Sequence, residues 1–140
     1  KYFFFYASSH QFPAYPGTGG ENNIAKNNLI NVPLRPYSGS EAFRDAYEKK
    51  ILSSLIKFNP ELIMLSAGFD GHEDDPLCQL NLVVQDFNWV TKELTKVARQ
   101  CCQSRLVSVL EGGYHLGALK DCVASHLSAL LSDVDQQCKL

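Results

Sequence analysis

Apolar positions along the chain form two kinds of pattern, which alternate between breaks that contain Gly or Pro. In the first kind nearly every residue of a short run is apolar, which is typical of strands buried on both faces of a parallel sheet. The runs that we expect to form strands are residues 2–7, 28–32, 62–66 and 106–110. We find no internal repeat, no low-complexity segment and no interdomain linker between them.

The second kind of pattern repeats apolar residues at helical spacing. The first such stretch is expected to run from about Glu41 to Phe58, where Asn59-Pro60 ends it. The other two have the apolar stripes Phe87, Val90, Leu94, Val97, Cys101 and Leu119, Val123, Leu127, Leu130. Together the elements predict an α/β fold: a mostly parallel sheet with flanking helices, joined by right-handed crossovers.

Composition supports one globular unit and excludes several classes of function. The 140 residues are 45% hydrophobic and 20% charged, which fits a single core. The net charge is −2 and the basic residues are scattered, so direct binding to nucleic acid or to an acidic membrane surface is not expected. The start has no signal-peptide layout and no apolar run reaches about 18 residues, so we expect a nuclear or cytoplasmic protein that is not secreted.

The cysteines do not form a recognisable framework. There are five of them and no C-x-x-C pair, which predicts reduced and mostly buried thiols instead of a zinc cluster or a set of disulfides. They are Cys78, Cys101, Cys102, Cys122 and Cys138.

Candidate chemistry lies in the loops that follow three of the strands, because open α/β sheets bind ligands at the carboxyl ends of their strands. Asp70 comes soon after the run 62–66 and is placed to reach a metal from a rigid element. Gly112 and Gly113 allow the backbone to approach closely whatever Tyr114 faces. Taken singly, a strand-end Asp is as often a cap or a loop brace, and Gly-Gly-Tyr is more often a turn.

Three spaced motifs, in this order, resemble the zinc-dependent histone deacetylases. Residues 9–19 (SHQFPAYPGTG) are similar to the family's Leu-His-x(n)-Phe-Pro-Gly-Thr-Gly loop. Residues 66–72 (SAGFDGH), with DPL at 75–77 and NL at 81–82, are similar to its Ser-Ala-Gly-Phe-Asp-x-His segment with the later Asp-Pro-Leu and Asn-Leu. Residues 110–114 (LEGGY) resemble the form found in class II and related bacterial deacetylases. The resemblance covers nearly the whole chain and implies that residues 1–140 are the C-terminal half of a deacetylase catalytic domain.

Carried over by position, the resemblance implies a role for each of five residues. Asp70 would be a zinc-ligating carboxylate, and the Tyr114 hydroxyl would hydrogen-bond the substrate carbonyl in the transition state. Leu77, Gly112 and Gly113 would line the acyl-lysine tunnel. The implied activity is zinc-dependent hydrolysis of acetyl-lysine amides in histones or other proteins, with a role in chromatin regulation.

The resemblance also implies a structural potassium ion near Ser8 and Ser9. A catalytic zinc takes about three protein ligands, however, and only Asp70 stands at a matching position. The family's Asp-x-His ligands and its tandem histidines belong before Tyr2, so we expect this chain alone to be inactive and to need the missing N-terminal half. His72 is expected to be a solvated residue or a neighbour of the ligands, and His126 a packed helix residue.

Other interpretations stay open at this point. The chain can belong to a non-catalytic deacetylase-like interaction module, or to an acetylpolyamine amidohydrolase. A receiver-like domain with Asp70 as phosphoacceptor is disfavoured, because the LEGGY segment has no role there. The acidic run Glu73 to Asp75 is either a rim that binds a basic histone tail or simply a solvated loop.

Overall fold

The structure is a computed structural model that describes residues 3–20 and 28–137, with side chains up to residue 132. Its strands are β1 (Tyr6–Gln11), β2 (Leu29–Leu34), β3 (Ile63–Ala67) and β4 (Leu106–Leu110). They form two parallel pairs, in which Tyr6 lies opposite Leu29 and Ile63 opposite Leu106. The α/β class and the parallel strand direction are therefore as predicted, although the described strands are not joined into one continuous ladder.

The helices follow the predicted periodicity. The first stretch is continuous from Ser40 to Phe58 and ends where Asn59 adopts a left-handed conformation, with φ of 57°, just before Pro60. It contains one turn of π-helix, which the apolar spacing did not indicate. The helical elements are α1 (Ser40–Ala46), the π-turn η2 (Tyr47–Ile51), α2 (Leu52–Phe58), α3 (Val84–Cys102) and α4 (Leu116–Gln137).

The beginning of the chain differs from the prediction of a buried strand over residues 2–7. Strand β1 begins at Tyr6 and continues to Gln11, and Tyr2 lies outside the described residues. Phe3 and Phe4 are largely exposed, at 102% and 71%. Apolarity alone placed the strand too early, because ladder pairing with β2, and not the aromatic run, sets its limits.

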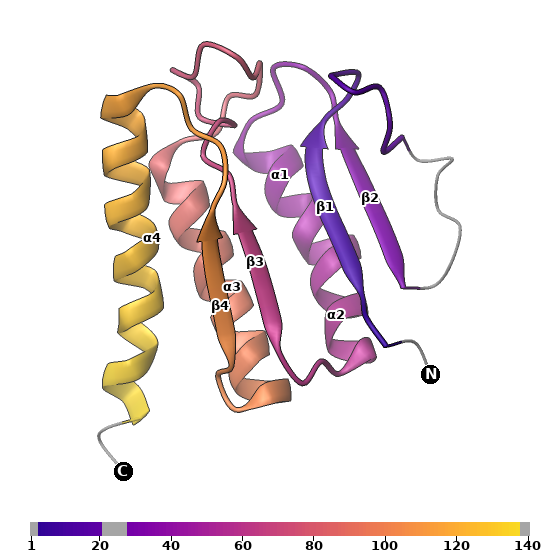
Figure 1. The fold of residues 1–140 in the computed structure, drawn as a ribbon, viewed down its shortest axis with the longest axis vertical. Helices are drawn as coiled ribbons and strands as arrows, with labels where there is room; N and C mark the ends of the chain where they lie inside the picture. Colours follow the sequence, from indigo (N-terminus) through magenta and orange to yellow (C-terminus); the bar gives the residue numbers. More distant parts are fainter. Residues whose placement is uncertain (1–2, 21–27, 138–140) are drawn as a thin grey trace.

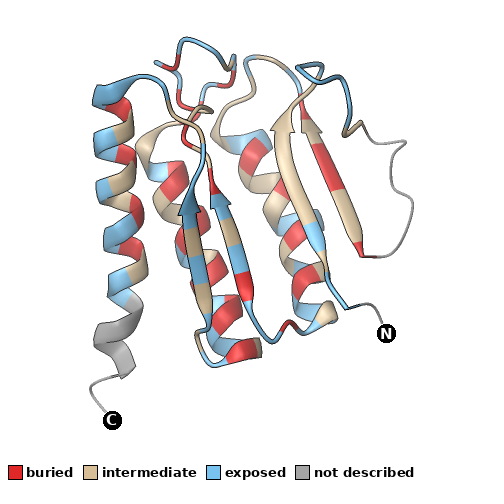
Figure 2. Cartoon of the chain, in the orientation of Figure 1, coloured by how far each residue is buried: buried red, intermediate tan, exposed pale blue. Residues whose placement is uncertain are grey.

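The helices lie on one side of the strands, so that one face of each strand pair is covered (Figure 1). In β3, Ile63 and Ala67 are buried while Met64 is 72% exposed. In β4, Val107 and Val109 are each 47% exposed, and Figure 2 shows exposed positions alternating with buried or intermediate ones in β3 and with intermediate ones along most of β4. Burial on both faces was thus wrong for β3 and β4 within the described residues. We call Met64, Val107 and Val109 the open face.

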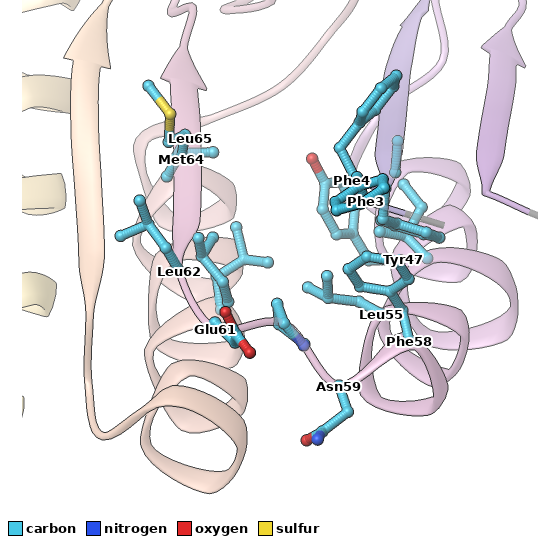
Figure 3. A pocket seen from close by; sticks show the side chains of 16 residues that line it. Phe3, Phe4, Tyr47, Leu55, Phe58, Asn59, Glu61, Leu62, Met64 and Leu65 are labelled. Atoms are coloured by element: carbon cyan, nitrogen blue, oxygen red, sulfur yellow. The ribbon is translucent and has the colours of Figure 1, made fainter. Parts of the chain in front are cut away.

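An apolar cavity of about 690 Å³ separates the two strand pairs. Figure 3 shows aromatic side chains, among them Phe4 and Phe58, on one side of it and aliphatic ones, among them Leu62 and Met64, on the other. Its floor is formed by α2 and η2 side chains such as Leu55. No hydrogen-bonded ladder joins β1 to β3 across it within the described residues.

Helix α4 packs through a narrower stripe than predicted. Its buried residues are Ala118, Cys122, His126 and Ala129, whereas Leu127 of the predicted stripe is 49% exposed. Small side chains and one hydrogen-bonded histidine allow α4 to lie close against α3. Within residues 3–20 and 28–137, no helix is both long and apolar enough to cross a membrane.

The four cysteines that the structure describes are free thiols, as predicted. Cys102 and Cys122 are fully buried, and Cys78 and Cys101 are partly exposed. Burial raises the pKa of the Cys122 thiol to about 11, which keeps it protonated and unreactive near neutral pH. Cys138 lies outside the described residues.

Candidate functional site

The loops that follow β3 and β4 run side by side at the carboxyl end of this strand pair. The pairing continues beyond the strands, because the Glu111 N–H donates to the Ala67 carbonyl at 3.0 Å and the Phe69 N–H donates to the Gly112 carbonyl at 2.8 Å. These two bonds bring Asp70, the residue after Phe69, next to the Gly112 backbone. The parallel register of β3 and β4 thus unites two motifs that lie far apart in the sequence.

The Asp70 carboxylate is packed against the backbone of two glycines. A Cβ at Gly112 would lie 2.6 Å from Asp70 Oδ1 and 2.8 Å from its Cγ, and a Cβ at Gly68 would lie 2.9 Å from Oδ1. Any side chain at Gly112 would therefore overlap the carboxylate. Glycine at this position permits this close approach, and a larger residue would displace the carboxylate.

Burial raises the pKa of the Asp70 carboxyl above its usual value, and the nearby charge of Asp75 raises it further. Both influences disfavour the ionised carboxylate. A cation bound at Asp70 would oppose them and favour the ionised form, so the carboxylate is suited to a metal. Among the residues that the structure describes, no three His, Cys, Asp or Glu side chains are grouped as a metal site.

Tyr114 is held through its backbone. The residue before it, Gly113, has φ of +136°, a conformation that other residues rarely adopt, and a Cβ there would lie 2.8 Å from Leu119 Cδ1. The Tyr114 N–H donates to Asp75 Oδ2 at 2.8 Å. Its side chain is 56% exposed. The turn thus presents the phenol at the surface of the site.

Asp70 and Tyr114 line the same cavity, of about 370 Å³, although 44 positions separate them. Ser9 and His10, near the end of β1, also line it, so the segments at the carboxyl ends of β1, β3 and β4 all contribute. This arrangement was predicted from the deacetylase resemblance. In a receiver-like domain, Tyr114 would have no reason to share a cavity with Asp70. Leu77 is not among the lining residues and is 70% exposed.

Gln11 is a residue of this site that sequence reasoning missed. Its Oε1 accepts a hydrogen bond from the Gln79 N–H at 2.7 Å and one from Cys78 Sγ at 3.4 Å. Gln11 Nε2 also donates to Gln79 Oε1 at 3.2 Å. The end of β1 is thereby tied to the loop after β3. The rule that picked out the strand ends points to Gln11 as well, because it is the last residue of β1 and directly follows His10.

His10 organises the loop that follows β1. Its Nε2 lies 3.2 Å from the Gly19 carbonyl, which can only accept, so in a neutral ring Nδ1 accepts from Ser8 Oγ at 2.9 Å. Ser9 Oγ donates to the Tyr47 hydroxyl at 3.4 Å. Both serine hydroxyls are therefore engaged with neighbouring side chains. A potassium ion near them stays a prediction.

His126 lies beneath the cavity, in a network that fixes its tautomer. The Thr91 hydroxyl donates to the Phe87 carbonyl at 2.6 Å, so it accepts from His126 Nδ1–H at 2.7 Å. His126 Nε2 then accepts from Ser108 Oγ at 2.9 Å. The ring packs edge-on against Phe69, the residue before Asp70, at 5.7 Å between centroids. His126 is therefore a packed helix residue, as predicted, and it also supports the floor of the site.

In the loop after β3, the solvated alternative is wrong for His72 and for one residue of the acidic run. His72 is buried and not solvated, and its Nδ1 accepts a hydrogen bond from the Asp74 N–H at 3.1 Å. In the acidic run, Glu73 and Asp74 are exposed but Asp75 is only 8% exposed. The loop turns back on itself through hydrogen bonds of its own backbone, and the order of polar residues along the chain gives no sign of this inward turn.

The fold and the cavity define an α/β protein with a candidate enzymatic site at the carboxyl edge of parallel strands. Residues 3–130 match the family model of the histone deacetylase domain, and the chain belongs to this family. It is 40% identical over 136 residues to type-2 histone deacetylase 2 of Dictyostelium discoideum, a match that covers 90% of this chain and 8% of that protein.

Solved structures agree with this assignment. The HDA15 HD domain superimposes with a TM-score of 0.84 at 26% identity, covering 91% of this chain and 37% of that one. An acetylpolyamine aminohydrolase from Burkholderia pseudomallei superimposes with a TM-score of 0.78 at 26% identity, covering 90% and 37% respectively. The chain therefore spans well under half the length of these proteins.

Proposed function

We propose that the protein to which these residues belong hydrolyses acetyl-lysine amides by a zinc-dependent mechanism. The observation that supports this most directly is the shared cavity of Asp70 and Tyr114, with Gly112 packed against the carboxylate. A ligand carboxylate and a hydroxyl donor on adjacent parallel strands are suited to one substrate carbonyl between them. Membership of the histone deacetylase family agrees with this chemistry.

In this proposal Asp70 is one zinc ligand, and the remaining ligands come from segments other than those described. When bound, zinc would polarise the acetyl carbonyl and lower the pKa of a bound water to about 7. The fit rests on the chemistry of the donor: a half-buried carboxylate whose ionised form is disfavoured until a cation offsets its surroundings.

The described residues would contribute positioning and charge stabilisation. The Tyr114 hydroxyl would donate a hydrogen bond to the oxyanion that develops on the substrate carbonyl. Gly112, which lines the cavity and has no side chain, would form a wall beside Tyr114 close to the acyl chain, whereas Gly113 is not among the lining residues and packs against Leu119. Leu77, which is exposed and next in the chain to the lining residue Cys78, would supply an apolar rim for the lysine stem.

The rest of a deacetylase domain would cover the open face formed by Met64, Val107 and Val109. Exposed apolar side chains in such a row are unusual on the surface of a folded monomer and mark a surface that another element covers. The chain spans 37% of each of the two superimposed structures, which leaves ample sequence to supply that element. We expect the complete protein to act in the nucleus or cytoplasm on acetylated histones or other acetyl-lysine proteins.

Acetylpolyamine hydrolysis is the second candidate, favoured by the superposition on an acetylpolyamine aminohydrolase. A panel of acetylated peptides and acetylpolyamines assayed with the complete protein separates the two. A non-catalytic module would show no turnover of either class while it keeps the fold.

The decisive test of the proposal compares two variants of the complete protein. Asp70→Ala should lose zinc, measured by metal analysis, because it removes a ligand. Tyr114→Phe should keep zinc and peptide binding but lose on the order of 10²- to 10³-fold in kcat, because it removes an oxyanion donor. Equal loss of zinc in both variants would show that the two roles are wrongly assigned.

A further inference from the structure

Asp75 is a buried carboxylate between exposed neighbours. It is 8% exposed, whereas Glu73 and Asp74 before it and Leu77 after it are exposed. All three hydrogen bonds that the structure gives its carboxylate come from backbone N–H groups. A buried charge is costly unless it is well hydrogen-bonded. These three N–H groups offset that cost, so the loop is built to hold a carboxylate at this position.

The two carboxylate oxygens of Asp75 serve two different loops. Oδ1 accepts from the Leu77 N–H at 2.9 Å and from the Cys78 N–H at 3.4 Å, within the loop after β3. Oδ2 accepts from the Tyr114 N–H at 2.8 Å, in the loop after β4. Hydrogen bonds to an ionised acceptor are about twice as strong as neutral ones. One side chain thus joins the wall of the cavity to the residue that carries the hydroxyl.

Few other contacts restrain Tyr114. Within residues 3–20 and 28–137, the Tyr114 hydroxyl makes no hydrogen bond, and its side chain is more than half exposed. Gly113, which precedes it, has no side chain to limit the backbone. Backbone bonds of Gly112 to Phe69 and of His115 to Leu119 hold the chain on either side, and the bond to Asp75 is the one that fixes the Tyr114 amide itself.

We infer that Asp75 is a positioning residue of the proposed reaction, which sets the Tyr114 hydroxyl at a fixed place relative to the Leu77–Cys78 segment. The inference rests on the proposed function of Tyr114. Asp75 itself would not touch the substrate. Replacing it with Asn keeps the size of the side chain but puts an N–H₂ group where one of the two loops needs an acceptor.

The test is a double-mutant cycle in the complete protein. Asp75→Asn should lower kcat by about 10- to 100-fold, with a smaller effect on KM, because small displacements of a reacting group are costly. In the Tyr114→Phe background the same substitution should lower kcat little further, because the hydroxyl that it positions is already absent. Asp121→Asn, the same chemical change on the exposed surface of α4, is the control and should leave kcat unchanged.

Equal losses in both backgrounds would overturn the inference, because they would mean that Asp75 acts on the fold in general. If Tyr114→Phe retains the full rate, the proposed function fails instead, and a measurement that does not need activity decides about Asp75. Hydrogen exchange of the Tyr114 amide should be slow in the wild-type protein and faster in Asp75→Asn. An unprotected Tyr114 amide in the wild-type protein would overturn the positioning role, and this holds even if the variant folds poorly.

Discussion

Replacing Gly112 with Ala is the sharpest perturbation of the candidate site. The added Cβ would lie 2.6 Å from Asp70 Oδ1, whereas ordinary van der Waals contacts begin at 3.4 Å. The carboxylate, or the backbone on either side of it, must therefore move by about 0.8 Å, a displacement that matters in a close-packed region. The same Asp70 oxygen is also close to Gly68, where an added Cβ would lie 2.9 Å from it.

The expected result is a displaced ligand in a protein that is otherwise folded. Substitutions that disturb the orientation of a metal ligand typically weaken metal binding by about 10- to 100-fold. A shift of this size at the reacting centre lowers the rate by up to about 10²-fold. Gly112→Ala in the complete protein should show both losses together, because the same carboxylate would control both.

The assay is zinc affinity by competition with a chelator, and then kcat and KM on an acetyl-lysine peptide. Gly117→Ala is a matched control, since it adds the same methyl group near the start of α4, where the nearest atom belongs to the His115 ring at 3.3 Å. It should leave zinc affinity and rate unchanged. Wild-type zinc affinity in Gly112→Ala would refute the claim that this glycine seats Asp70 as a ligand.

Burial is the basis of two further predictions. Because burial lowers the pKa of His126 below its ordinary 6.5, the unfolded chain binds a proton more readily, so stability should fall as pH drops below about 6.5. His126→Gln should flatten that part of the curve of unfolding free energy against pH, and an unchanged slope would contradict the buried neutral ring. The 140-residue chain alone should self-associate through its open face, and Val107→Lys with Val109→Lys should reduce this in analytical ultracentrifugation. A monomeric wild-type chain would count against an uncovered apolar surface.

The sequence by itself determined the order and type of the elements. Apolar runs located β3 and β4 to within a residue, and helical spacing located the Ser40–Phe58 segment. These patterns are local, because each reflects which apolar side chains along a short segment are buried away from solvent. The motifs around Asp70 and Tyr114 also pointed to the correct family, because close backbone approach restricts those positions to few residue types.

Only the tertiary structure decided which residues those patterns bring together. The parallel register of β3 with β4 places Gly112 against Asp70, and the fold of the acidic loop turns Asp75 inward toward Tyr114. The glycines only signal a close approach without naming the partner, and the inward turn of Asp75 has no signature along the chain, since Asp75 has the same chemistry as its exposed neighbour Asp74. The aromatic start was mispredicted for the same reason: burial depends on what covers a strand, and that is a property of the assembled domain and not of the strand's own sequence.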